Sequence, residues 1–263
     1  MEEYSFQPEI LKRNLNHSAN IIYLSKTTST NQIAKEYAVN GAEEGTIVVA
    51  NEQTLGRGRL GRRFFSKNGV YFTLVLRPKL KPEDVILITS AVAVAVCEAT
   101  KNLGFESPKI KWVNDIFLNN KKVCGILCES CFNSRGEVEF SLLGIGANLF
   151  VPKEGFPKEI ENIAGSMFDT FKEGVMEKFV ANVVNIFMKY YSNLMTSNFP
   201  DKYKEYSMII GKNITYFRQT EQTKALVLDI DNRCRLKVKK EDGEIEFLSS
   251  GEVTIGSHNI KNQ

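Results

Sequence analysis

The most regular feature of the chain is a series of short apolar segments separated by polar and turn-forming residues. Segments of this length, rich in branched and aromatic residues, predict strands over residues 21–24, 46–53, 70–76, 109–112, 122–132 and 137–149. Longer stretches predict helices over residues 29–40, 82–103 and 174–195. Pro82 at the start of the second stretch fits the first turn of a helix.

The pattern changes after Pro200, where only short β-prone runs remain. They cover residues 212–217, 224–231, 234–239 and 245–248, and Asp-Asn and Asp-Gly turns separate them. Several short strands in so few residues predict a small barrel. We therefore expect two domains, residues 1–208 and residues 209–263.

Composition limits the class of protein. With 263 residues, of which 43% are apolar, the chain can bury a sizeable core. Its net charge of only +3 requires any anion site to come from local clustering, which residues 52–67 provide. We find neither a secretory leader nor the ~18 uninterrupted apolar residues of a membrane span. The sequence predicts a cytoplasmic protein.

The five cysteines are an odd number and favour reduced thiols over a disulfide framework. Cys124, Cys128 and Cys131 have a spacing that could hold an iron–sulfur cluster. Strand alternation, however, directs the first two to one face and Cys131 to the other, which favours buried structural thiols. The histidines, His17 and His258, lie near opposite ends of the chain and are predicted at the surface.

Residues 56–63 form the most unusual segment, because three glycines alternate there with four arginines. Such a backbone can fold closely around an anion while the guanidinium groups supply charge and paired donors. This composition favours phosphate handling. By itself it is also compatible with nucleic-acid binding or with a solvated surface.

Glycines recur on strand faces in the centre of the chain. Gly125 shares a face with Leu127, and a second face carries Gly144, Gly146 and Asn148. Repeated glycine on one face marks the close approach of a ligand or of another backbone, although a bulge or a tight crossing gives the same pattern. With Gln53 at the end of a third strand, we expect a flat floor beside a polar rim.

Ser29 and Gln32 have the spacing of a capping box at the start of the first long helix. A capping hydroxyl beside a cleft can also serve a polar ligand, because unpaired N–H groups gather at a helix N-terminus. Both roles remain open for Ser29.

Taken together, these motifs resemble those of the biotin protein ligases. The similarity covers about residues 20–256. Two departures are Val113, where the family usually has proline, and Phe64, where the aromatic residue after the basic loop is often tryptophan. The motifs that carry the resemblance, in order, are residues 29–31, Gln53, residues 56–62, 111–115, 122–127 and 144–148, and Gly251-Glu252-Val253.

The resemblance implies an α+β fold with a mixed-sheet catalytic domain of the class II synthetase type and a small C-terminal SH3-like β-barrel. Some family members also carry a DNA-binding domain, but only 28 residues precede Ser29, too few for its three helices and wing. We therefore expect a ligase without repressor activity and no DNA partner. Dimers through sheet edges are common in the family, and the chain offers no independent sign of one.

The activity implied by the resemblance is activation of biotin by ATP to biotinyl-5'-AMP. Biotin then passes to a lysine of a biotin carboxyl carrier protein domain of a biotin-dependent carboxylase. The reaction needs fixed cations around the phosphates, and Mg²⁺ is the implied cofactor.

The resemblance also assigns roles to single residues. The implied catalytic residues are Lys122, Arg59 and Lys111. Asp115 is the implied Mg²⁺ ligand, and Lys111 and Asp115 are expected to work as a pair. The implied biotin-binding residues are Ser29, Thr30, Asn31, Gln53, Arg57, Gly58, Arg59, Lys122, Gly125, Leu127, Gly144 and Gly146. The implied ATP-binding residues are Arg57, Arg59, Arg62, Lys111, Asn114, Lys122 and Asn148.

Three other functions compete with this interpretation. A lipoate ligase has a related fold and the same adenylate chemistry, but it lacks the Gly-Arg-Gly-Arg loop. A nucleic-acid-binding module would use the same arginines, with steeply salt-dependent binding. A non-catalytic scaffold would release no pyrophosphate.

Overall fold

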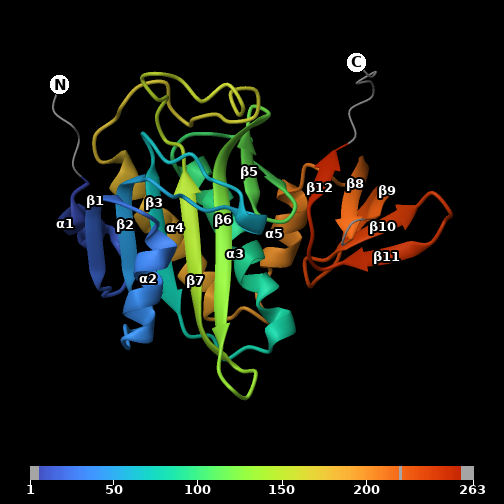
Figure 1. Ribbon diagram of the computed structural model, residues 1–263, viewed down its shortest axis with the longest axis horizontal. Coiled ribbons are helices and arrows are strands. Elements are labelled where there is room, and N and C mark those ends of the chain that lie inside the picture. Colours follow the sequence, from blue (N-terminus) through green and yellow to red (C-terminus); the bar gives the residue numbers. More distant parts are fainter. Residues whose placement is uncertain (1–5, 219–220, 256–263) are drawn as a thin grey trace.

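The computed structural model describes residues 6–218 and 221–255. Its larger part is a seven-stranded mixed sheet with helices on both faces, and a separate five-stranded antiparallel sheet follows toward the C-terminus (Figure 1). This arrangement confirms the predicted α+β class.

The large sheet has the strand order β1-β2-β3-β7-β6-β5-β4. Only β1 and β2 are parallel, and helix α2 forms the crossover between them. The seven strands are β1 (Ile21–Thr27), β2 (Ile47–Gln53), β3 (Val70–Leu76), β4 (Lys109–Lys111), β5 (Asp115–Leu118), β6 (Lys121–Phe132) and β7 (Val138–Ala147). The helices are α1 (Pro8–Asn14), α2 (Thr30–Val39), α3 (Ile86–Asn102), α4 (Val175–Tyr191) and α5 (Phe199–Tyr206).

The small sheet has the order β11-β10-β9-β8-β12. Its strands are β8 (Asn213–Arg218), β9 (Glu221–Ile230), β10 (Leu236–Lys240), β11 (Ile245–Leu248) and β12 (Val253–Ile255). The sequence did not predict α1, α5, β5 or β12, which are all short. Pro82 begins a 3₁₀ turn, Pro82–Asp84, and α3 starts only afterwards at Ile86.

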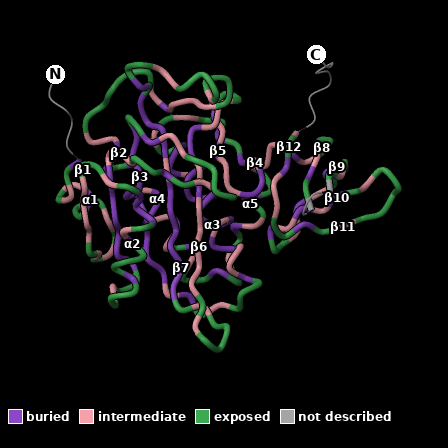
Figure 2. Tube along the Cα trace, in the orientation of Figure 1, coloured by how far each residue is buried: buried purple, intermediate pink, exposed green. Residues whose placement is uncertain are grey.

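Alternation along β2 and β3 divides their side chains between two apolar layers. Ile47 and Phe72 belong to the main core with α3 and α4, whereas Val48 and Val75 pack on the other face beneath α2. The central strands β3 and β7 are buried along most of their length (Figure 2). Helix α3 contacts both the sheet and α4 and is therefore buried along most of its length. In the described part of the chain, no helix has the combined length and apolarity that crossing a membrane requires.

All five cysteines are free thiols. Cys124 and Cys128 pack into the main core and Cys131 into the layer beneath α2, which confirms the predicted division between faces. Burial raises the pKa of the Cys128 thiol to about 12. No group of three metal-ligating side chains occurs among the residues described. His17, which we predicted at the surface, is half-buried, and His258 lies outside the described residues.

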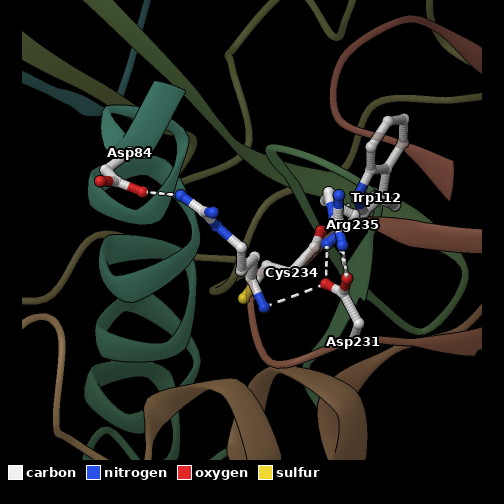
Figure 3. A network of polar contacts seen from close by, with 6 residues as sticks. Asp84, Trp112, Asp231, Cys234 and Arg235 are labelled. Carbon is white, nitrogen blue, oxygen red and sulfur yellow. Dashed lines mark hydrogen bonds and ion pairs between the residues drawn. The ribbon is translucent and has the colours of Figure 1, made fainter. Parts of the chain in front are cut away.

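One turn of the small sheet contacts the body of the molecule at two places. The Trp112 indole donates from Nε1 to the carbonyl oxygen of Cys234 at 3.0 Å, and Arg233 forms an ion pair with Asp84 (Figure 3). The turn that presents both groups is held by Asp231, whose Oδ1 accepts the backbone N–H of Arg233 at 3.0 Å. Because Trp112 lies between β4 and β5, this turn braces the connection between those two strands.

We predict that Trp112→Phe lowers the free energy of unfolding by about 1–3 kcal/mol, because it leaves the buried Cys234 carbonyl without its donor. Thermal unfolding followed by circular dichroism measures the change. Arg13→Ala, which alters an exposed side chain of α1, serves as the control and should unfold like the wild type. A wild-type midpoint for Trp112→Phe would show that the hydrogen bond contributes nothing.

Candidate active site

A single pocket gathers the residues singled out in the sequence. Its walls are the N-terminus of α2, the loop after β2, the β4–β5 connection, β6, β7 and the segment before β12. Of the predicted site residues, the following line it: Ser29, Thr30, Asn31, Gln53, Arg57, Gly58, Arg59, Arg62, Lys111, Asn114, Asp115, Lys122, Gly125, Leu127, Gly144 and Gly146.

Asn148 is the one predicted residue that does not line the pocket. It follows β7 and is buried, and its Nδ2 donates to the carbonyl oxygen of Gly165 at 3.1 Å. The strand ends at Ala147, so the chain has left the pocket floor before it reaches Asn148. Its placement in the nucleotide site is not supported by the geometry.

Ser29 occupies the N-cap position of α2, as predicted, but its side chain makes no capping hydrogen bond. Gln32 instead meets the Thr28 hydroxyl, at 3.5 Å, so the predicted capping box is wrong. Ser29 is buried and lines the pocket, so of its two predicted roles the contact with a ligand is the one that its position favours.

The glycine floor exists, but other side chains of the protein cover it. A Cβ built on Gly146 would meet the Phe64 ring at 2.7 Å, and one built on Gly125 would meet the same ring at 2.8 Å. On Gly144, a Cβ would lie 2.2 Å from Oδ1 of Asn31. Gly125 and Gly146 are neighbours across β6 and β7, so Phe64 rests on a surface formed by two bare backbones.

The basic loop connects the antiparallel strands β2 and β3, as predicted. The Phe64 N–H donates to the Gly56 carbonyl oxygen at 2.8 Å, and the Gly58 N–H donates to Arg62 at 2.7 Å. Leu60 and Gly61 form its tip with positive φ angles of 55° and 73°. The backbone bonds at its base hold the arginines over the pocket.

The cations of the pocket have specific partners. Lys122 Nζ lies 2.6 Å from Asp115, so the carboxylate that we paired with Lys111 is instead neutralised by Lys122. Lys111 is the cross-strand neighbour of Asp115 in the β4–β5 ladder and also lines the pocket. Arg59 donates to Oδ1 of Asn114 at 3.3 Å. Burial lowers the pKa of the Arg59 guanidinium, because desolvation disfavours its charge.

The C-terminal segment completes the pocket through Glu252, which forms an ion pair with Arg62 at 2.5 Å. The sequence motif around Glu252 indicated that the segment matters, but not that it reaches the basic loop. Six basic side chains and two acidic ones line the pocket, so it carries a net positive charge suited to an anionic ligand. They are Arg57, Arg59, Arg62, Arg63, Lys111 and Lys122, with Asp115 and Glu252.

Sequence profiles agree with this geometry. The profile of the biotin/lipoate A/B protein ligase family matches residues 23–148, which include most of the pocket. The profile of the biotin protein ligase C-terminal domain matches residues 209–256. The first match defines the class, a protein ligase of the biotin and lipoate type, and the second distinguishes the biotin branch.

Individual relatives give the same result. The chain is 33% identical over 242 residues to the bifunctional ligase/repressor BirA of Bacillus spizizenii, covering 90% of this chain and 74% of that protein. A biotin--[acetyl-CoA-carboxylase] ligase of Paracoccus denitrificans is 38% identical over 129 residues, 48% of this chain and 53% of its own length. This chain belongs to the biotin protein ligase family.

A solved structure from the same family shares the fold. The biotin protein ligase from Aquifex aeolicus in complex with biotin and ATP superimposes with a TM-score of 0.72 and is 26% identical. The similarity covers 90% of this chain and 98% of that one, so it includes both sheets.

We predict that Gly146→Ala loosens the basic loop, because the new methyl group must displace Phe64, whose backbone closes the loop at Gly56. Losing about 1.4 kcal/mol of packing would raise the population of the open loop about tenfold. The rate of tryptic cleavage at the loop arginines should rise by the same factor, because cleavage follows that population.

Gly165→Ala is the matched control for this prediction, because its methyl group meets Lys121, outside the pocket, instead of Phe64. We expect cleavage of the loop at the wild-type rate in this variant. Equal acceleration in both variants would show that the contact with Phe64 does not hold the loop.

Proposed function

We propose that the chain joins biotin to ATP, forming biotinyl-5'-AMP and pyrophosphate, and then transfers biotin to a lysine of a biotin carboxyl carrier protein domain. The observation that carries this proposal is one pocket in which a polar rim adjoins a concentration of arginine and lysine side chains. The rim, formed by residues 29–31 and Gln53, suits the ureido ring, and the basic side chains suit the triphosphate.

In the first step the biotin carboxylate attacks the α-phosphorus, and pyrophosphate leaves. Negative charge builds on the phosphorus oxygens and on the leaving group, so fixed cations stabilise the transition state. Lys122 bridges the carboxylate and the α-phosphate in this proposal, because its side chain lines the pocket beside Gly125, and its Nζ lies 5.7 Å from the centroid of the Phe64 ring that covers the floor.

The other cations have complementary roles. Lys111 holds the outer phosphates, Arg57 and Arg59 fold over the acyl-phosphate, and Arg62 reaches the leaving group. Arg59 and Arg62 have neutral or acidic partners in the pocket, Asn114 and Glu252, that position them before a nucleotide binds. Such preorganisation lowers the reorganisation cost of the reaction.

A nucleotide-borne Mg²⁺ fits the donor set around Asp115. This carboxylate lines the pocket with 24% of its side chain exposed, and Mg²⁺ needs only one or two carboxylates when phosphate oxygens and water complete its octahedron. When bound, the ion would neutralise phosphate charge. Asp115 would hold it, and Lys122 would exchange its present contact with Asp115 for the reacting oxygens.

In the second step the ε-amine of the acceptor lysine attacks the mixed anhydride, the amide bond forms, and AMP leaves with its bonding electrons. The amine loses a proton to solvent. The basic loop covers the anhydride meanwhile and excludes water that would hydrolyse it. The acceptor domain and its carboxylase form part of this proposal.

Two features of the assembly complete the proposal. A domain boundary between residues 208 and 209 fits the start of the C-terminal profile match at residue 209. Strands β1 and β4 are the edges of the large sheet, and a homodimer would form through one of them. Sedimentation equilibrium distinguishes the monomer from the dimer.

The experiment that tests the function is exchange of labelled pyrophosphate into ATP, with biotin, lipoate or neither present. Exchange that requires biotin supports the proposal. Exchange with lipoate alone identifies a lipoate ligase, and no exchange with either acid contradicts adenylate synthesis.

We predict that Lys122→Ala reduces biotin-dependent exchange by a hundredfold or more, since loss of one fixed cation at the transition state costs about 3 kcal/mol. Lys121→Ala is the matched control, because that neighbouring lysine bonds to the backbone of Glu161 and Asn162 outside the pocket. Wild-type exchange by Lys122→Ala would remove Lys122 from the catalytic residues.

Gln53→Ala is expected to raise the KM for biotin about tenfold and to leave kcat nearly unchanged, because a group that holds the ureido ring acts equally in ground and transition states. Steady-state kinetics at saturating ATP separates the two constants. A fall in kcat with an unchanged KM would place Gln53 in the chemical step instead.

A further inference from the structure

A chain of buried and partly buried hydrogen bonds, here called the polar seam, lies between α2 and the large sheet behind the proposed biotin rim. Thr73, fully buried in β3, donates from Oγ1 toward Oδ1 of Asn31 at 2.6 Å and also lies 2.9 Å from the Thr30 hydroxyl. On the far side, Nδ2 of Asn31 donates to Oε2 of Glu129 at 2.8 Å. Thr73 and Glu129 do not line the pocket, and both contact residues that do.

The seam continues from Thr30 toward the basic loop. Both the backbone N–H and the hydroxyl of Thr30 donate to Oε1 of Gln53, at 2.8 and 3.2 Å. Nε2 of Gln53 then donates to Ser66 at 3.0 Å, and the Ser66 hydroxyl donates to the carbonyl oxygen of Phe64 at 3.1 Å. Every link has a defined direction, because a hydroxyl has one proton to donate and an amide has one accepting end.

Glu129 sets the donor and acceptor direction of the hydrogen bonds in the seam. Its carboxylate can only accept, so it requires the NH₂ end of the Asn31 amide to face it. If the amide were reversed, two oxygen atoms would face each other at hydrogen-bond distance, and both would lack a proton. Thr30 has given its own proton to Gln53, so the Thr73 proton is the one available to Oδ1 of Asn31.

The position of Asn31 is as constrained as its orientation. Its Oδ1 lies where a Cβ of Gly144 would stand, so the amide presses against the bare backbone of the pocket floor. The amide nitrogen carries two protons, of which Glu129 takes one. The second is therefore available to an acceptor oxygen in the pocket.

We propose that Glu129 and Thr73 are positioning residues for the biotin head group: they hold the Asn31 amide in one orientation and so fix the donor and acceptor pattern of the rim. This inference rests on the proposed function, because it takes the ligand to be a urea-type ring. Neither residue touches the ligand, and both act through Asn31.

Glu129→Gln tests the proposal, because it keeps the size of the side chain but can donate as well as accept, so that both orientations of Asn31 become populated. We expect the KM and Kd for biotin to rise about tenfold, on the scale of one charged hydrogen bond, with kcat changed less than twofold. Thr73→Val should act in the same direction, and Thr73→Ser, which keeps the hydroxyl, should remain near the wild type.

The decisive measurement repeats Glu129→Gln in an Asn31→Ala background. If Glu129 acts through Asn31, the substitution has no further effect on biotin binding there. An equal effect in both backgrounds would overturn the proposal, as would unchanged biotin affinity in Glu129→Gln. Ser130→Ala is the matched control: it removes the neighbouring hydrogen bond between Ser130 and Ser141, 2.7 Å long, and should leave the biotin KM unchanged.

A ligand-free readout separates this proposal from the function itself. The side-chain amide of Asn31, observed by ¹⁵N NMR, should give one pair of slowly exchanging proton signals in the wild type and shifted, faster-exchanging signals in Glu129→Gln. Identical spectra would overturn the positioning role. If the wild type binds no biotin but its spectrum still differs in this way from that of Glu129→Gln, the proposed function is overturned and the positioning role is not.

Discussion

The close contact between the first turn of α2 and strand β7 is the constraint on which the pocket depends. Only a glycine at position 144 lets Asn31 approach the strand, because any side chain there would occupy the space of the amide oxygen. That approach brings Asn31 within reach of Thr73 and Glu129 and allows the polar seam to close. Buried polar groups are costly when unpaired, so each member of the seam stabilises the placement of the next.

The charges of the pocket depend on the same scaffold. Lys122 is paired with Asp115, and Arg62 with Glu252, so in the protein alone two of the six cations are partly neutralised. A phosphate group entering the pocket competes with these carboxylates for the same cations. The two ion pairs therefore reduce the mutual repulsion among the basic side chains, while the pocket keeps the net positive charge that attracts an anion. Because Glu252 comes from the segment before β12, the C-terminal sheet takes part in this balance.

Much of the architecture was predictable because it follows from local patterns. The strand over residues 70–76 was predicted with its observed ends, the basic loop does join two paired strands, and the cysteines divide between faces as alternation requires. Prediction failed where an element was too short to show a hydrophobic pattern, or where one sequence motif was compatible with two structures. Helix α5 and strand β12 are too short to show a period, and the spacing of Ser29 and Gln32 fits a capping box that the structure does not form.

By itself the sequence determined the kinds of elements, the chemistry of the loop and the glycine positions, because these depend on residue type and on a period of a few residues. Only the tertiary structure decided which side chains meet. Asp115 is paired with Lys122 rather than with its cross-strand neighbour Lys111, near a register shift between β5 and β6, and Phe64 covers the floor formed by Gly125 and Gly146. Such contacts depend on strand register and on the docking of α2, which bring together residues far apart in the chain, and no local pattern records them.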